Sequence, residues 1–127
     1  MKQKKATPTA SELEILNVLW ENGPSTVKVV HNVLSETKGV GYTTTLKIMQ
    51  NMHEKGFLSR KPEGRSHIYH AAYEQEETRG RLLDRFLEST FSGSASSLVM
   101  QLLGNKKTSQ KELDEIKRII DKMDKNS

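Results

Sequence analysis

The sequence of 127 residues predicts a mainly α-helical fold that contains one small β-hairpin. Three observations predict it. Apolar side chains recur at helical spacing along most of the chain. Several of these stretches begin with a serine or threonine, which can cap a helix. Between residues 57 and 72 the helical period gives way to two short extended segments around a turn.

The first two helices are expected to be capped by hydroxyl side chains. Thr9 and Glu12 have the spacing of a capping box, in which the hydroxyl caps the helix and the glutamate reaches back. Residues 22–24, Asn-Gly-Pro, end this helix. A second helix begins at Ser25 or Thr26 and carries a stripe of valines. Because valine is β-branched, a strand is the alternative, but the period favours a helix.

The stretch from Gly41 to Leu58 predicts a third helix. The threonines at residues 43–45 can cap its start, where Gly41 can supply an unusual backbone angle, and Gly56 can end it. Two methionines lie on one buried stripe. The side chains expected on its exposed face are Thr44, Lys47, Gln50, Asn51 and Glu54.

A β-hairpin is expected after the third helix. Residues 57–61 and 67–72 are the extended candidates, and residues 62–66 have the composition of a tight turn. Three helices followed by a hairpin are the plan of a winged helix-turn-helix, in which the hairpin is the wing. We expect residues 1–73 to form such a DNA-binding domain.

The remainder of the chain is expected to contain three helices. The first has four or five turns and ends at residues 92–94. Ser94 or Ser96 can cap the short second helix, although a flexible linker is the alternative for this serine-rich stretch. Ser109 begins a second capping box, which starts the last helix.

Residues 74–127 have broad apolar faces but too little chain to close a stable core alone. We therefore predict a homodimer, joined by an isologous contact through this region. A monomer in which these helices fold back onto the first domain is the alternative. The expected interface residues are Leu82, Leu83, Phe86, Leu87, Phe91, Leu98, Val99, Leu102, Leu113, Ile116, Ile119, Ile120 and Met123.

The positive charge is concentrated in the first domain. The net charge is +4. Residues 1–73 contain ten Lys and Arg against six Asp and Glu, whereas residues 74–127 contain ten against ten. This distribution indicates a polyanionic partner for the first domain.

Several function classes are excluded. The chain has no cysteine, which removes disulfides, cysteine-ligated zinc and a thiol nucleophile. It has no HExxH, GxSxG or phosphate-binding glycine loop, so we expect no enzyme activity and no cofactor. His67 and His70 would lie on opposite faces of a strand, so no metal site is expected. Neither a signal peptide nor a membrane span is present, and a cytoplasmic protein is expected.

Hydroxyl, amide and cationic side chains can read base edges or bind phosphates. On the third helix the candidates are Thr43, Thr44, Lys47, Gln50 and Asn51, and on the wing they are Arg60, Lys61, Arg65 and His67. Tyr42 and Ser25 could add phosphate hydrogen bonds or act as local caps or packing groups. A protein-interaction module and an architectural DNA binder without sequence preference are the alternative functions.

Six segments in this order resemble the penicillinase repressor family of bacterial regulators: TASELEILNVLW, PSTVKVV, GYTTTLKIMQNMHEKGFLSR, GRSHIY, SGSASSLV and SQKELDEI. The resemblance implies a winged-helix domain, a helical dimerisation region and repression by binding double-stranded DNA at palindromic operators.

The resemblance also has implications for how repression is relieved. Members that respond to β-lactams are cut by a membrane sensor protease between an asparagine and a phenylalanine. The matching positions here are Gln101 and Leu102, which form a candidate cleavage site. Copper-responsive members carry a cysteine cluster, which this chain lacks, so copper sensing through thiolates is excluded.

Overall fold

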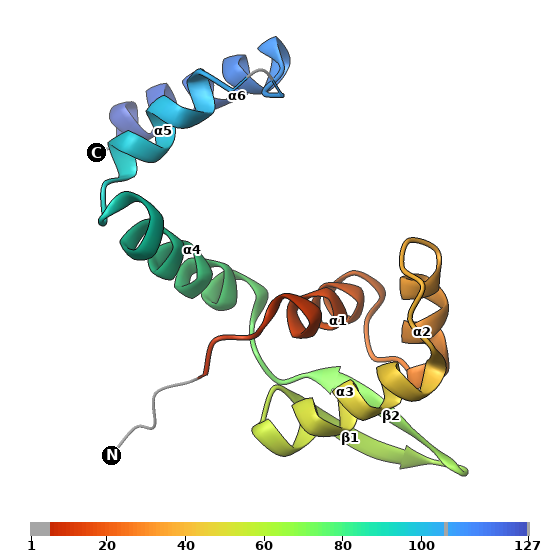
Figure 1. The fold of residues 1–127 in the computed structure, drawn as a ribbon. Coiled ribbons are helices and arrows are strands. Elements are labelled where there is room, and N and C mark those ends of the chain that lie inside the picture. The colour runs from red at the N-terminus through yellow and green to blue at the C-terminus, as the bar shows by residue number, and fades with distance from the viewer. Residues whose placement is uncertain (1–5, 106, 127) are drawn as a thin grey trace, which may run out of the picture. The chain divides into compact units, whose positions relative to one another are not determined.

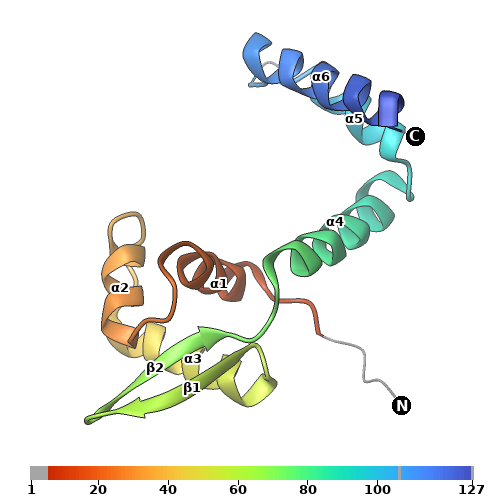
Figure 2. The same ribbon diagram turned by 180° about the vertical axis from the view of Figure 1, so that it is seen from behind.

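The computed structural model describes residues 6–105 and 107–126. The elements follow in the order α1 (Ala10–Asn22), α2 (Val27–Ser35), α3 (Tyr42–Lys55), β1 (Leu58–Glu63), β2 (Ser66–Ala71), α4 (Gln75–Phe91), α5 (Ala95–Leu103) and α6 (Gln110–Asn126). Figures 1 and 2 show these helices and the hairpin from opposite sides. The predicted fold class, mainly α with a winged helix and one hairpin, is confirmed.

The caps of α1 and α2 agree with the sequence. The Glu12 N–H donates to Thr9 Oγ1 at 3.2 Å, and the Thr9 N–H donates to Glu12 Oε1 at 2.8 Å, which completes the capping box. Of the two candidate caps for α2 it is Thr26 whose hydroxyl accepts from the Val29 N–H, at 3.3 Å. α2 is a helix, so the alternative of a strand is wrong.

The start of α3 differs from the prediction. Gly41 is the N-cap, its φ of −74° is ordinary, and no side chain caps the helix. The three threonines lie inside the first turns, and the third of them, Thr45, is buried. The end agrees with the prediction, because Gly56 adopts the left-handed conformation with a φ of 90°.

The two strands reach closer to the turn than expected, so the turn of the hairpin is tighter. Pro62 and Glu63 belong to β1, and Ser66 begins β2, so the turn is reduced to Gly64 and Arg65. β1 is an edge strand, and a proline is tolerated there because one side of this strand makes no ladder hydrogen bonds. This places Arg65 at the tip of the hairpin.

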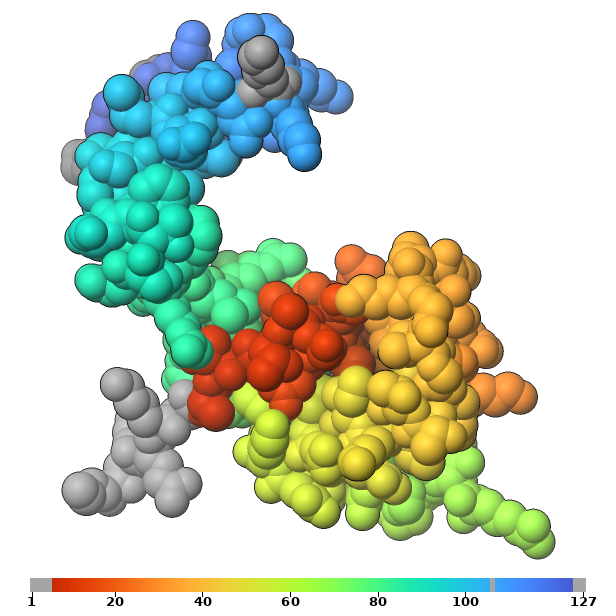
Figure 3. Space-filling model, in the orientation of Figure 1, coloured from red at the N-terminus to blue at the C-terminus, as the bar shows by residue number. Residues whose placement is uncertain are grey.

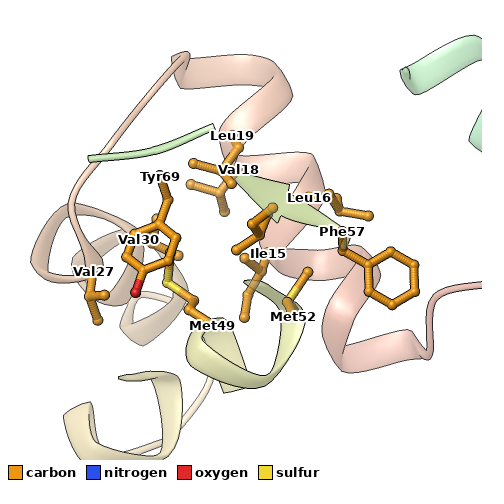
Figure 4. Packing of buried hydrophobic residues seen from close by; sticks show 11 residues of the cluster. Ile15, Leu16, Val18, Leu19, Val27, Val30, Met49, Met52, Phe57 and Tyr69 are labelled. Carbon is orange, nitrogen blue, oxygen red and sulfur yellow. The ribbon is translucent and has the colours of Figure 1, made fainter. Parts of the chain in front are cut away.

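The core lies among α1, α2, α3 and the hairpin. Ile15, Leu16, Met49, Met52 and Tyr69 are at most 2% exposed, and Figure 4 shows side chains from these elements converging. The loop before α2 is joined to β2 by two backbone bonds: Ser25 N–H donates to Tyr69 O at 3.1 Å, and Tyr69 N–H donates to Ser25 O at 2.8 Å. This junction fixes the hairpin against the helices.

The chain forms two compact units, one ending at Leu82 and the other beginning at Leu83. The division falls inside α4, whereas the sequence-based boundary follows Tyr73. In the second unit Ser94 Oγ accepts from the Ser97 N–H at 3.1 Å and caps α5. None of the described residues from Leu83 on is buried. Among the described residues, no helix is long and apolar enough to span a bilayer.

Candidate nucleic-acid interface

The exposed face of α3 is polar over its whole length. Thr43, Thr44, Lys47, Gln50 and Asn51 are all exposed, as the helical period predicted. The opposite face, which contains Thr45, Met49 and Met52, is buried in the core. The core therefore fixes the helix in the orientation that presents these hydroxyl, amide and ammonium groups to solvent.

Two lysines near this surface are neutralised by α1. The Lys38 ammonium forms an ion pair with Glu14, and the Lys55 Nζ lies 3.1 Å from Glu12 Oε2. Lys28, Lys47, Lys61 and Arg65 make no ion pair within the part of the chain that the structure describes. Among the described residues of the first unit, the cations that remain available to a polyanion are therefore at the start of α2, on α3 and on the hairpin.

Glu12 is a buried carboxylate that is held in its charged form. Burial raises its pKa, but the hydrogen bonds from the Thr9 backbone, Lys55 and the Thr9 hydroxyl more than compensate, so that the pKa is lowered below its ordinary value. Glu12 is only 6% exposed. The ion pair of this carboxylate with Lys55 joins the last turn of α3 to the first turn of α1.

An open groove of about 440 Å3 lies between α2, α3 and the hairpin. Figure 3 shows α2 and α3 side by side on one surface, with the hairpin projecting from it. The residues that line the groove are Thr26, Val27, Lys28, Tyr42, Leu46, Gln50, Arg65, Ser66, His67 and Tyr69. The groove therefore brings together predicted residues from α3 and from the wing.

The sequence analysis did not identify Lys28 and Thr26 as part of this surface. Both lie at the start of α2, whose free backbone N–H groups suit an anion. The sequence contained a signal for this surface, because a helix start with a nearby lysine can attract an anion. Ser25 has the packing role instead, since it is buried and its hydroxyl donates to the Gly23 carbonyl at 2.9 Å.

The wing residues divide between the two faces of the hairpin. Arg60 pairs with Tyr69 in the strand register, on the face that meets the helices, and its Nη1 donates to the Tyr69 hydroxyl at 3.3 Å. His67 lies on the same face, whereas Lys61 is on the opposite face, with His70. No cluster of three or more metal-ligating side chains is found among the described residues.

A sequence model of the penicillinase repressor family matches residues 8–122. The chain belongs to this family. It is 21% identical over 122 residues to the methicillin resistance regulatory protein MecI of Staphylococcus aureus strain N315, covering 96% of this chain and 99% of that one. It is 25% identical over 111 residues to the penicillinase repressor of Bacillus licheniformis, covering 87% of each.

A solved structure related to this repressor family shows the same fold. The chain is similar to the monomeric form of Bacillus licheniformis BlaI, solved in solution in complex with the blaP half-operator. The TM-score is 0.52 at 24% identity, and the match covers 60% of this chain and 93% of that one. The winged-helix arrangement of α1 to β2 is therefore the arrangement found in that protein.

Proposed function

We propose that the chain is a transcriptional repressor that binds operator DNA with sequence specificity through α3 and the hairpin. One observation carries the proposal: the exposed polar face of α3 borders a groove whose other walls supply Lys28 and Arg65, which have no ion-pair partner among the described residues. The similarity to BlaI, which was solved with a half-operator, supports the same function.

The residues have two kinds of role in this proposal. Thr43, Thr44 and Lys47 lie in the N-terminal half of α3, which enters the major groove deepest, so they contact base edges. Gln50 and Asn51 are one turn further along and can pair with adenine. The groups that bind the phosphate backbone are Lys28, Tyr42, Arg60, Lys61, Arg65 and His67.

The second unit supplies the dimer contact. Leu83, Phe86, Ile119, Ile120 and Met123 are between 46% and 69% exposed, which leaves a large apolar area in water. A second copy would cover it, and two-fold symmetry of the protein implies palindromic operators. The repressor would act in the cytoplasm, where bacterial DNA lies.

Release from DNA is proposed to involve a membrane sensor protease acting at Gln101 and Leu102. Both side chains are exposed, but the peptide bond between them lies inside α5. A protease needs extended backbone, so cleavage requires α5 to unwind locally. Co-expression with the membrane sensor protease that cuts a β-lactam-responsive member of the family, followed by mass spectrometry, should give a fragment ending at Gln101; an intact chain after induction would contradict this step.

The function is tested by titrating fluorescent duplexes at two salt concentrations. One duplex carries the chain's own upstream region and the other a random sequence. We expect tighter binding to the upstream duplex at both salt concentrations, with affinity falling as salt rises. Equal affinity for both duplexes would indicate an architectural binder. Binding to neither would indicate a protein-interaction module.

A further inference from the structure

We propose that His31 is a positioning residue for DNA recognition, which fixes the first turn of α3 and the ring of Tyr42. The inference rests on the proposed function. His31 lies on α2, and its Nδ1 is hydrogen-bonded to Thr45 Oγ1 at 3.1 Å. Its ring also meets the ring of Tyr42 edge to face, with centroids 5.6 Å apart and an interplanar angle of 83°. One side chain of α2 therefore contacts two residues of α3.

The start of α3 needs such an external contact. Its N-cap, Gly41, offers no side-chain hydrogen bond, so the usual local fixation of a helix start is missing. In the preceding loop a Cβ on either Gly39 or Gly41 would meet nothing within 4 Å, so no other part of the chain packs against these two positions. Thr45, by contrast, is only 2% exposed, and its hydroxyl is directed to His31.

His31 acts through its neighbours. It is half-buried and does not line the groove, whereas Tyr42 lines the groove and is 46% exposed. An aromatic ring held edge to face has fewer orientations than a free one, so less conformational entropy is lost when it contacts DNA. The residues that follow Tyr42 include Thr43 and Thr44, so the same contact also sets their position relative to bases.

The test measures specificity in the folded full-length chain. We expect His31→Ala to weaken binding to the upstream duplex about 3- to 10-fold, and to change binding to random DNA by less than about twofold. Thr45→Val keeps the buried shape and removes only the hydrogen bond, and it should reproduce part of this loss. Thermal melting by circular dichroism establishes that each variant is folded at the titration temperature.

A matched control and a double-mutant cycle exclude a merely structural role. His53→Ala removes another half-buried histidine, on the far end of α3, and should leave both affinities within about twofold. In a Tyr42→Ala background, His31→Ala should cost less operator affinity than in the wild type, because its contact with the ring is already lost.

Three outcomes are decisive. The role of His31 would be overturned if folded His31→Ala lost the same affinity for both duplexes, or if it lost none. It would also be overturned if the losses of operator affinity in His31→Ala and Tyr42→Ala were fully additive. A wild type that prefers neither duplex would instead overturn the proposed function, and with it the inference. Preserved wild-type preference together with a selective loss in His31→Ala would support both.

Discussion

The two units of the chain differ in where their apolar side chains are covered. Up to Leu82 the chain buries a core of its own, built around residues such as Leu16, Met49 and Tyr69. From Leu83 on, no described residue is buried, although α5 is mainly apolar and α6 has one apolar face. A unit with its own core can hold a recognition surface in fixed geometry. A unit without one gains stability when a second copy covers it.

The largest expected effect on operator affinity comes from a charge introduced into the apolar face of α4. Phe86, which is 46% exposed and lies edge to face with Phe91, is central to the proposed dimer contact. Phe86→Glu should give a folded monomer whose operator affinity is lower by about 10²- to 10⁴-fold, because the linked second half-site is lost. Sedimentation measures the mass. Phe86→Leu, which stays apolar, should remain a dimer; a Phe86→Glu variant that is still dimeric would remove this face from the interface.

The next effect distinguishes the two units by their stability. Leu16 is fully buried, so Leu16→Ala should lower the free energy of unfolding by about 2 to 5 kcal/mol at any protein concentration. Ile119 is 58% exposed in the single chain, so Ile119→Ala should act mainly on dimer dissociation. Urea unfolding at two protein concentrations separates these effects. If both variants lowered the free energy of unfolding equally in dilute solution, the second unit would have a core of its own.

Base reading in the first unit is tested at Lys47. Lys47→Ala should weaken operator binding about tenfold and binding to random DNA much less, since a lysine contact to guanine discriminates between bases. Lys55→Ala removes a lysine of the same helix whose ammonium is already paired with Glu12, and should leave the preference for operator intact. Equal losses on the two duplexes would refute the assignment of Lys47.

The buried Glu12 predicts loss of stability in acid. Its pKa is lowered in the folded protein, so its contribution is complete above the ordinary value of 4.5 and is lost as the pH falls through the folded value. Glu12→Gln should lower the free energy of unfolding by about 1 kcal/mol at pH 7, with a flatter dependence below pH 5. Glu21→Gln, at an exposed site of α1, should keep the wild-type dependence. Unchanged acid sensitivity in Glu12→Gln would exclude this carboxylate as its source.

The smallest effect is expected at the tip of the wing. Arg65→Ala should weaken binding to every duplex by about threefold and reduce the slope of log affinity against log salt by about one. Arg79→Ala removes a cation of α4 that is 3.8 Å from Glu76, and should not change the slope. An unchanged slope in Arg65→Ala would show that the tip makes no phosphate contact.

Local signals in the sequence predicted much of the fold. The Thr9 capping box, the glycine end of α3 and its polar face were confirmed, because each depends on residues within a few positions of one another. The strand boundaries were wrong around Pro62, because turn composition was given more weight than the tolerance of an edge strand for proline.

Contacts between distant residues could not be predicted in the same way. Lys38 pairs with Glu14, 24 positions away, and Lys55 pairs with Glu12, 43 positions away. The count of basic residues therefore overstated the number of cations that are free to bind a polyanion. Likewise, Thr45 was predicted as a possible helix cap, but its buried hydroxyl is hydrogen-bonded to His31 instead. Lys28 lines the groove only because α2 packs beside α3.

Hydroxyl-radical footprinting of the wild-type chain on its own upstream DNA tests the central claim most directly, because it reports sequence specificity and two-fold symmetry together. We predict two protected patches related by two-fold symmetry, with centres about 10 base pairs, or a multiple of that, apart. A single unsymmetrical patch would contradict the dimer, and uniform weak protection of all sequences would contradict a specific repressor.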